Sequence, residues 1–402
     1  MNSKERVLTA VNLAEPDRVP IDLLPNRWVE ERLHRDLGTH THRELLERLC
    51  CDVVDLRGVV DPIYRGPMPN GAKTSTGSPQ SRPPACGSAF NMEGEAELSR
   101  LQNDSKTLVL EPFGQVPFSR DLGNGVRENL WGWRQKTVQT ATGPEEQFVE
   151  FALDQATTIE ELQQHRWPSP DWFDFSEVST RLDAWQDFAV MASGPSVFQH
   201  PTFLRRSDNL LMDMAVAPEM AHWLMDQFTD FYVAFYDRML TSAQGKIDIL
   251  RTADDMGMQH SLFISPEMFR TFVKPRVKRL VDLAHSHDVK FMFHSCGAIR
   301  PLIDDLIEIG VDILDPLQAA AEGMEPQGLK ETYGKRICLH GGICTQYLLP
   351  NGTAAEVRSE VKRRIAIFGK GGGYILSPCH VLQNDVPTAN IVAMVDAALE
   401  VG

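Results

Sequence analysis

Short apolar runs alternate with helical patterns in the second half of the chain. The runs cover residues 188–192, 247–250, 289–293, 312–314, 337–339 and 374–376. Between them, apolar residues recur at the spacing of amphipathic helices, as at Val357, Val361, Ile365 and Phe368. Repeated strand–helix units with short apolar strands indicate a parallel sheet. At least six such units favour an α/β fold of the (β/α)8 TIM-barrel type over an open sheet.

The first half of the chain follows a different pattern. We expect a helix over the first dozen residues, a second helix over residues 29–49 and a strand over residues 52–56. Residues 58–95 are rich in Gly, Pro, Ser and Asn, which is typical of a long loop. Alternation at 107–110, 132–138 and 147–151 predicts antiparallel hairpins. The expected organisation is one barrel domain over residues 1–402, with an N-terminal extension and an inserted, irregular hairpin and loop region around 58–150.

The composition narrows the class of protein. The 402 residues include 40 Lys and Arg against 55 Asp and Glu, which gives a net charge of −15. Such an acidic chain is not expected to bind nucleic acid or an anionic membrane through a general basic surface. There is no apolar stretch of membrane-spanning length, and the charged start lacks the apolar core of a signal peptide. The odd number of cysteines, seven, argues against a disulfide framework and for the cytoplasm.

Chemically active residue types gather where the predicted strands end. In a TIM barrel the active site lies at the carboxyl ends of the strands. The side chains found there are Ser193, Asp254, Asp255, His294, Cys296, Asp315, His340, Cys379 and His380. Histidine, aspartate and cysteine are not typical of the apolar layers that fill a barrel. Their presence therefore predicts a catalytic site at this end.

The most specific local pattern is His294-x-Cys296. Residues i and i+2 of an extended strand point to the same side, so this imidazole and this thiolate can converge on one ion. Cys379 follows a later strand and can supply a third ligand. Three nitrogen and sulfur ligands with one open position are typical of a catalytic zinc site, where the metal acts as a Lewis acid. The competing interpretation is that His294 and Cys296 are ordinary buried side chains.

The other strand-end residues leave more than one role open. Asp254 and Asp255 suit an acid–base group, a fourth metal ligand or a carboxylate at a helix N-terminus. Ser193, His340 and His380 are candidates for substrate binding, and His380 suits a metal ligand or a solvated surface position as well. Among the remaining cysteines, Cys338 is expected in the core and Cys344 in a loop, with Cys344 a substitute ligand at most.

These residues carry a family resemblance. The segments 264–276 (from Ile-Ser-Pro-Glu-Met to Lys-Pro-Arg), 293–297 (Phe-His-Ser-Cys-Gly), 309–316 (Ile-Gly-Val-Asp-Ile-Leu-Asp-Pro) and 340–343 (His-Gly-Gly-Ile) resemble the uroporphyrinogen decarboxylase superfamily. The N-terminal segment up to Asp17-Arg18-Val19-Pro20 fits it too. The resemblance is densest over residues 247–395 and weak over 58–180. It implies a (β/α)8 barrel, in agreement with the strand–helix pattern.

Two branches of the superfamily differ in the expected chemistry. Uroporphyrinogen decarboxylases are metal-free and carry an Arg-Gln-Ala-Gly-Arg type of motif near the N-terminus, whereas residues 22–28 here read Asp-Leu-Leu-Pro-Asn-Arg-Trp. The cobamide-dependent methyltransferases use a His-x-Cys … Cys zinc site, which His294, Cys296 and Cys379 resemble. The resemblance therefore implies a zinc methyltransferase that works with cobalamin carried by a corrinoid protein.

The reaction that this resemblance implies is transfer of a methyl group to cob(I)alamin from a small-molecule donor. The first expectation is a methoxylated aromatic compound, which is O-demethylated, although the reverse transfer to an acceptor such as a thiol uses the same site. The runner-up is a metal-free, uroporphyrinogen decarboxylase-like decarboxylase. A non-catalytic corrinoid-binding scaffold is the third alternative, and a homo-oligomer is left open.

Overall fold

A seven-stranded parallel sheet forms the centre of the protein. The computed structural model describes residues 1–56, 60, 62–66, 72–74, 118–140 and 143–401. In spatial order the strands are β1 (Val53–Asp55), β9 (Ala189–Ser193), β10 (Ile249–Ala253), β11 (Lys290–His294), β12 (Ile313–Leu317), β13 (Cys338–Ile343) and β14 (Tyr374–Pro378). Every predicted apolar run overlaps one of these strands. The predicted α/β fold around a parallel sheet is thus confirmed.

The two edges of this sheet are joined by a short N-terminal segment, Pro20–Asp22. The amide of Leu376 in β14 donates to the carbonyl of Pro20, and the amide of Asp22 donates back to the carbonyl of Leu376, both at 2.9 Å. On the other edge, the amide of Asp52 donates to the carbonyl of Ile21 at 2.8 Å. The segment forms an isolated bridge and not a regular strand, so the eight-stranded closed barrel stays a prediction.

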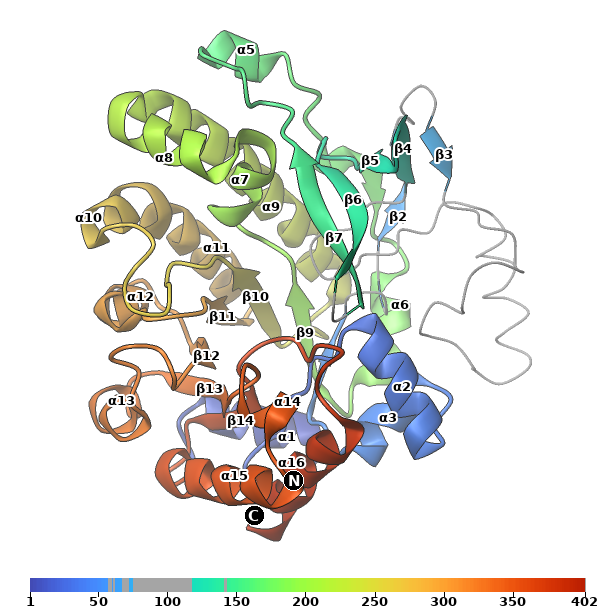
Figure 1. Cartoon of the computed structure of the whole chain (residues 1–402), viewed down its shortest axis with the longest axis vertical. Helices are drawn as coiled ribbons and strands as arrows, with labels where there is room; N and C mark the ends of the chain where they lie inside the picture. Colours follow the sequence, from blue (N-terminus) through green and yellow to red (C-terminus); the bar gives the residue numbers. More distant parts are fainter. Residues whose placement is uncertain (57–59, 61, 67–71, 75–117, 141–142, 402) are drawn as a thin grey trace.

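Helices surround the parallel sheet and flank the inserted region (Figure 1). They are α1 (Ser3–Val11), α2 (Arg27–Leu37), α3 (His42–Arg48), α5 (Ile159–Gln163), α6 (Val178–Leu182), α7 (Gln199–Arg205), α8 (Ser207–Val216), α9 (Pro218–Ala243), α10 (Pro266–Met268), α11 (Lys274–Ser286), α12 (Ile303–Glu308), α13 (Pro326–Tyr333), α14 (Leu348–Asn351), α15 (Ala354–Phe368) and α16 (Thr388–Glu400), with a π-helical turn at Phe269–Val273 and 3-10 turns at Pro170–Trp172, Asp183–Trp185 and Arg300–Leu302. The capping box predicted at Thr353 and Glu356 starts α15.

The single helix predicted over residues 29–49 is wrong. Gly38 adopts a left-handed φ of 68° and ends α2, and Thr41 then caps the start of α3. Glycine tolerates that backbone conformation because it has no Cβ. The apolar periodicity continues through the break, since both helices bury one face against the same core.

The inserted region contains a five-stranded antiparallel sheet. Its strands are β3 (Ala72–Thr74), β4 (Phe118–Gly123), β5 (Val126–Glu128), β6 (Arg134–Thr140) and β7 (Gly143–Glu150), and β2 (Ile63–Tyr64) pairs separately with β8 (Phe173–Asp174). The predicted hairpins are confirmed for 132–138 and 147–151, whereas 107–110 lies outside the described residues. Trp131 anchors this region by stacking on Phe228 of α9, with ring centroids 4.6 Å apart.

The interior of the parallel sheet has an apolar layer toward its amino-terminal end. That layer is formed by Val53, Ala189, Met191, Ile249, Met292, Ile313, Cys338 and Ile375, and α1 packs beneath it with Val7, Ala10 and Val11. Cys338 is thus a core residue, as expected. Toward the carboxyl ends of the strands the inward side chains become charged. Within the described part of the chain, no helix is both long and apolar enough to cross a membrane.

Candidate metal centre

Three possible metal-binding side chains meet at the carboxyl ends of the strands. His294 is the last residue of β11, Cys296 follows it by two positions, and His380 follows the end of β14. One ligand atom from each of the three lies within 4.8 Å of the others. The Sγ atom of Cys296 is 3.7 Å from Nε2 of His294. The imidazole and thiol of the His-x-Cys pattern therefore lie on the same side of the chain, as their spacing predicts.

Cys379 lies next to this group without belonging to it. Its side chain is buried, and its Sγ atom donates to the carbonyl oxygen of Leu317 at 3.1 Å. Burial, with the carboxylates of Asp255 and Asp315, raises the pKa of Cys296, and the neighbouring Cys379 adds to this shift. Cys379 thus lies near the metal centre, and its predicted role as the third ligand stays a prediction. His380, predicted to bind substrate, supplies the third donor atom in this geometry.

The two neighbouring aspartates after β10 have different surroundings. Asp254 is fully buried, and its carboxylate accepts hydrogen bonds from the Ser196 hydroxyl and from three backbone amides of residues 197–199. These bonds fix the loop after β9. Asp255 is partly exposed; its Oδ1 atom accepts from the amide of Cys296 and lies 3.7 Å from Nε2 of His294. Of the two predicted catalytic carboxylates, Asp255 is the one beside the metal centre.

The Nδ1 atom of His294 faces a carboxylate. It lies 2.7 Å from Oδ2 of Asp315, the third residue of β12. Arg251 of β10 donates from Nε to the same oxygen at 2.8 Å, and its Nη2 is 2.6 Å from Nδ1 of His294. Burial alone would raise the pKa of Asp315, but Arg251 and the adjacent histidines hold it well below its usual range. Asp315 is therefore a buried anion beneath the candidate metal centre.

His340 of β13 lies on the other side of Asp315. Its Nδ1 atom is 2.7 Å from Oδ1 of Asp315, and its Nε2 atom is 3.0 Å from Oδ2 of Asp22. Burial disfavours the charged ring, but the two carboxylates outweigh burial and raise the pKa of His340 to about 9. Both ring nitrogens are occupied by protein groups. The predicted substrate-binding role of His340 stays a prediction.

Ser193, another predicted substrate-binding residue, also has protein partners. Its hydroxyl donates to Oδ2 of Asp55 at 2.7 Å, and its carbonyl accepts from the Tyr236 hydroxyl. Asp55 contributes to raising the pKa of Arg251, against the effect of burial. The sequence assigns no role to Asp22, Asp55 or Arg251, and it places Asp315 among the strand-end residues without a specific role. Their signal was the position of charged residues within or beside strands whose other inward residues are apolar.

The donor atoms of this candidate metal centre fit zinc. Imidazole nitrogen and thiolate sulfur are the preferred ligands of that ion. A metal-binding histidine usually donates its second ring N–H to a carboxylate, which is the relation between His294 and Asp315. Burial raises the pKa of the Cys296 thiol and that of Cys379, the latter to about 12. Neither thiol is thus ionised at neutral pH by its surroundings alone, whereas a bound cation stabilises the thiolate.

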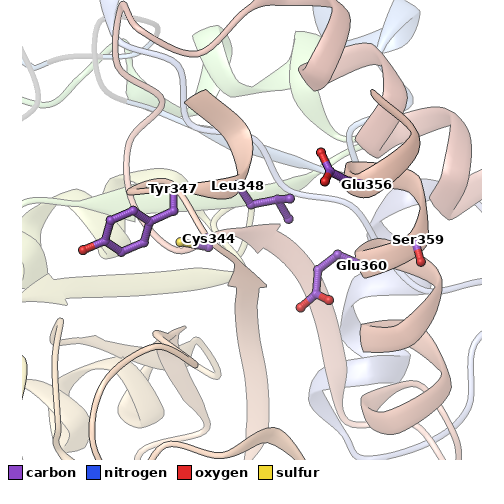
Figure 2. Close-up of a pocket in the computed structure, with 6 residues that line it drawn as sticks. All are labelled: Cys344, Tyr347, Leu348, Glu356, Ser359 and Glu360. Carbon is purple, nitrogen blue, oxygen red and sulfur yellow. The ribbon is translucent and has the colours of Figure 1, made fainter. Parts of the chain in front are cut away.

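A separate cavity lies beyond the end of β13 (Figure 2). It has a volume of about 410 Å³ and is lined by Cys344, Tyr347, Leu348, Glu356, Ser359 and Glu360. Figure 2 shows Cys344 between Tyr347 and Leu348, and Glu360 pairs with the buried Arg364. Since Cys344 is not in the group of His294, Cys296 and His380, the substitute-ligand role considered for it receives no support from this geometry.

Comparison with known proteins shows the family. Residues 188–401, more than half of the chain, match the sequence model of the family described as Uroporphyrinogen decarboxylase (URO-D). The chain belongs to this family. The expected superfamily is confirmed, and two relatives support its methyltransferase branch.

The relatives match slightly less than half of the chain at low identity. A methylcobamide:CoM methyltransferase, MtaA, from Methanosarcina barkeri is 26% identical over 176 residues, which is 43% of this chain and 47% of that protein. A methylated-thiol–coenzyme M methyltransferase from Methanosarcina mazei is 28% identical over 183 residues, or 46% and 45%. A uroporphyrinogen decarboxylase from Pseudomonas aeruginosa is 23% identical over 201 residues, or 49% and 52%. The chain spans about half the length of the curated relatives it matches.

A solved structure described as a methyltransferase from Methanosarcina mazei has a similar fold. It covers 100% of this chain and 99% of that one, with a TM-score of 0.57 and 18% sequence identity. At this identity the likeness concerns the fold. It extends the similarity beyond the segment that the family model matches.

Proposed function

We propose that this protein is a zinc-dependent methyltransferase that moves a methyl group between a small molecule and the corrinoid of a partner protein. The observation that carries the proposal is the convergence of His294 Nε2 and Cys296 Sγ at 3.7 Å. It occurs at the carboxyl end of β11, in a chain that is similar to methylcobamide-dependent enzymes. A reaction class that needs a nitrogen and sulfur metal site accounts for this pair, whereas the metal-free decarboxylase gives it no role.

In this proposal His294, Cys296 and Cys379 would hold the zinc ion, and His380 is the neighbouring donor. Cys379 is preferred as third ligand because the sequence pattern matches the His-x-Cys … Cys site of the methyltransferase branch. Its buried thiol also influences the pKa of Cys296. The alternative third ligand is His380, whose ring is already within the group. Substitution of Cys379 and of His380, with zinc content measured for each variant, distinguishes the two candidates for the third ligand.

Bound zinc would supply Lewis acidity toward the oxygen or sulfur atom that carries or receives the methyl group. The protein residues then have distinct tasks. His294 and Cys296 fix the position of the ion relative to the strand ends. Asp255, partly exposed and 3.7 Å from His294 Nε2, is placed to accept or return the proton of an alcohol or thiol at the mouth of the site.

The methyl donor is expected to be a methoxylated aromatic compound. This expectation comes from the resemblance, since no described side chain has been found to select an aromatic ring. The names of the two Methanosarcina relatives point to a thiol acceptor instead. Aryl methyl ethers, methanol, methylamines and thiols are therefore compared in the same assay, in both directions of transfer.

The decarboxylase alternative has less support from the buried charges. A substrate with several carboxylates needs cations that are free to bind it. Arg251, the arginine of the buried charged layer, is already engaged by Asp315. Residues 22–28 lack the decarboxylase motif, and in this segment the Asp22 carboxylate contacts His340. This segment therefore places an anion, and not a carboxylate-binding arginine, beside His340.

Two further features belong to the proposal. We infer that Pro20–Asp22 takes the place of the eighth strand and closes the barrel, on the basis of its hydrogen bonds to both sheet edges. We also place the protein in the cytoplasm, because the cysteines among the described residues are unpaired.

The deciding experiment is metal analysis of the protein purified without added metal, followed by a methyl-transfer assay. We expect about one zinc per chain in the wild type, and loss of most of it in Cys296→Ser and Cys379→Ser. Cys344→Ser is the matched control, because this thiol lies beside the separate cavity and should leave the zinc content unchanged. Loss in His380→Gln with retention in Cys379→Ser would assign the third position to His380.

The assay follows the absorbance change between cob(I)alamin and methylcob(III)alamin with each methyl donor or acceptor. Zinc-dependent turnover with one of them supports the methyltransferase. If the wild type binds no zinc even when it is supplied, and no donor is turned over, the proposal is wrong and carboxylated substrates become the next to test.

A further inference from the structure

A line of hydrogen-bonded side chains runs from the metal centre into the barrel. His294 Nδ1 lies 2.7 Å from Asp315, Asp315 lies 2.7 Å from Nδ1 of His340, and Nε2 of His340 lies 3.0 Å from Asp22. The four side chains come from β11, β12, β13 and the Pro20–Asp22 segment, and each is at most 7% exposed. Folding thus brings together residues as far apart as positions 22 and 340.

We propose that Asp315 is a positioning residue that holds His294 in the tautomer with a proton on Nδ1, and that His340, held between Asp315 and Asp22, keeps Asp315 in place. In that tautomer Nε2 has a free lone pair directed toward the side of Cys296. The inference rests on the proposed function, because the use of that lone pair is to bind the metal. It assigns roles to Asp22, Asp315 and His340 that act through His294.

The geometry around Oδ2 of Asp315 decides which tautomer is favoured. Nε and Nη2 of Arg251 lie 2.8 and 2.7 Å from this oxygen, and His294 Nδ1 lies 2.7 Å from it. Arginine nitrogens only donate hydrogen bonds. A carboxylate oxygen accepts several hydrogen bonds, so Oδ2 of Asp315 can also accept one from an Nδ1–H of His294. Arg251 Nη2 also lies 2.6 Å from His294 Nδ1, which fits the opposite tautomer, in which Nδ1 accepts from the guanidinium; the NMR measurement below separates the two arrangements.

The second carboxylate oxygen explains the need for His340. Oδ1 of Asp315 accepts from His340 Nδ1, and Oδ2 of Asp22 accepts from its Nε2, so His340 donates from both ring nitrogens. The ring therefore ties β12 to the N-terminal segment across the barrel. With Oδ1 fixed in this way, Oδ2 remains directed at His294 and Arg251.

In Asp315→Asn, either orientation of the amide loses the hydrogen bonds on one side, toward His340 or toward His294 and Arg251. Its amide oxygen can face His294 and Arg251, but its NH2 group then meets the N–H of His340. In the opposite orientation the NH2 group meets two donors and favours the other tautomer of His294. Loss of a carboxylate behind a ligating histidine typically weakens metal binding by about 10- to 100-fold.

The first test is the tautomer of His294 in the metal-free wild type, measured by NMR of the protein with 15N-labelled histidine. The resonances are assigned by their absence in His294→Gln. We expect a proton on Nδ1 and none on Nε2 at neutral pH. A proton on Nε2 would overturn the inference, and this result does not depend on whether Asp315→Asn or His340→Gln folds.

The second test is zinc affinity, measured by competition with a chelator. Asp315→Asn should bind zinc about 10- to 100-fold more weakly than the wild type, and His340→Gln should weaken it in the same direction. Asp248→Asn is the matched control: that buried carboxylate accepts from the amide of Val190 and pairs with Lys4 at the opposite end of the barrel. It should lower stability without changing zinc affinity.

The outcomes separate this inference from the proposed function. If the wild type binds zinc and Asp315→Asn binds it equally well, the positioning role is wrong and the metal centre stands. If the wild type binds no zinc, the proposed function fails, and the tautomer measurement still decides the role of Asp315. Equal weakening in Asp315→Asn and Asp248→Asn would also overturn the inference, because it would indicate a general loss of stability.

Discussion

The buried ring of His340 makes the stability of this protein depend on pH in a predictable direction. Its pKa is raised to about 9 in the folded protein, against an unfolded value of about 6.5. Below pH 6.5 the ring is protonated in both states, and its ion pairs with Asp315 and Asp22 stabilise the folded state fully. Between pH 6.5 and 9 only the unfolded chain releases the proton, so this contribution is lost as the pH rises.

The size of the effect follows from the shift. One pKa unit corresponds to about 1.4 kcal/mol, so a shift of this size contributes about 3 kcal/mol to the free energy of unfolding. His340 is only 4% exposed, and screening by solvent is therefore small. In His340→Gln the ring is absent, and this pH dependence should disappear while the remaining titrations are shared with the wild type.

The assay is urea unfolding of both proteins with a chelator present, at pH 6, 7.5 and 9.5. We expect the difference in the free energy of unfolding, wild type minus variant, to be largest at pH 6 and to fall by about 3 kcal/mol by pH 9.5. NMR titration of His340 in the folded wild type provides a direct check. A difference that stays constant over this range, or a midpoint of His340 near 6.5, would refute the reasoning.

Three further predictions concern the metal site and the frame around it. In metal-free protein, the partly exposed thiols of Cys50, Cys296 and Cys344 should be alkylated before the buried ones, and of these three zinc should protect only Cys296; peptide mass spectrometry measures the rates. Gly297→Ala should weaken zinc binding in chelator competition, because φ is 89° there and a Cβ would lie 2.6 Å from the carbonyl oxygen of Gly257; unchanged affinity would contradict this packing. Thr353→Ala should lower the free energy of unfolding by about 1 kcal/mol through loss of the α15 cap, with zinc content unchanged.

Much of this protein could be predicted from local sequence patterns. Strand positions follow from short apolar runs, and the start of α15 follows from Thr353 and Glu356, because these signals depend on residues that are close in the chain. The same holds for His294 and Cys296, since a two-residue spacing on an extended backbone places both side chains on one side. The sequence by itself therefore determined the fold class and the first two candidate ligands.

Only the tertiary structure decided the rest of the site. Asp254 and Asp255 are adjacent in sequence. The carboxylate of Asp254 is hydrogen-bonded to the loop after β9, whereas that of Asp255 faces the candidate metal centre. Cys379 and His380 are also adjacent, and the structure directs them to different partners. Such choices depend on how each loop leaves its strand, which no periodicity specifies.

The buried charges illustrate the physical reason most clearly. His340 meets Asp22 across 318 positions of sequence, through the closure of the sheet by the Pro20–Asp22 segment. A single charged residue in an apolar strand is costly to bury without a partner, and the sequence around it does not indicate where that partner lies. The register of neighbouring strands supplies the partner, and with it the tautomer of His294 and the charge of His340.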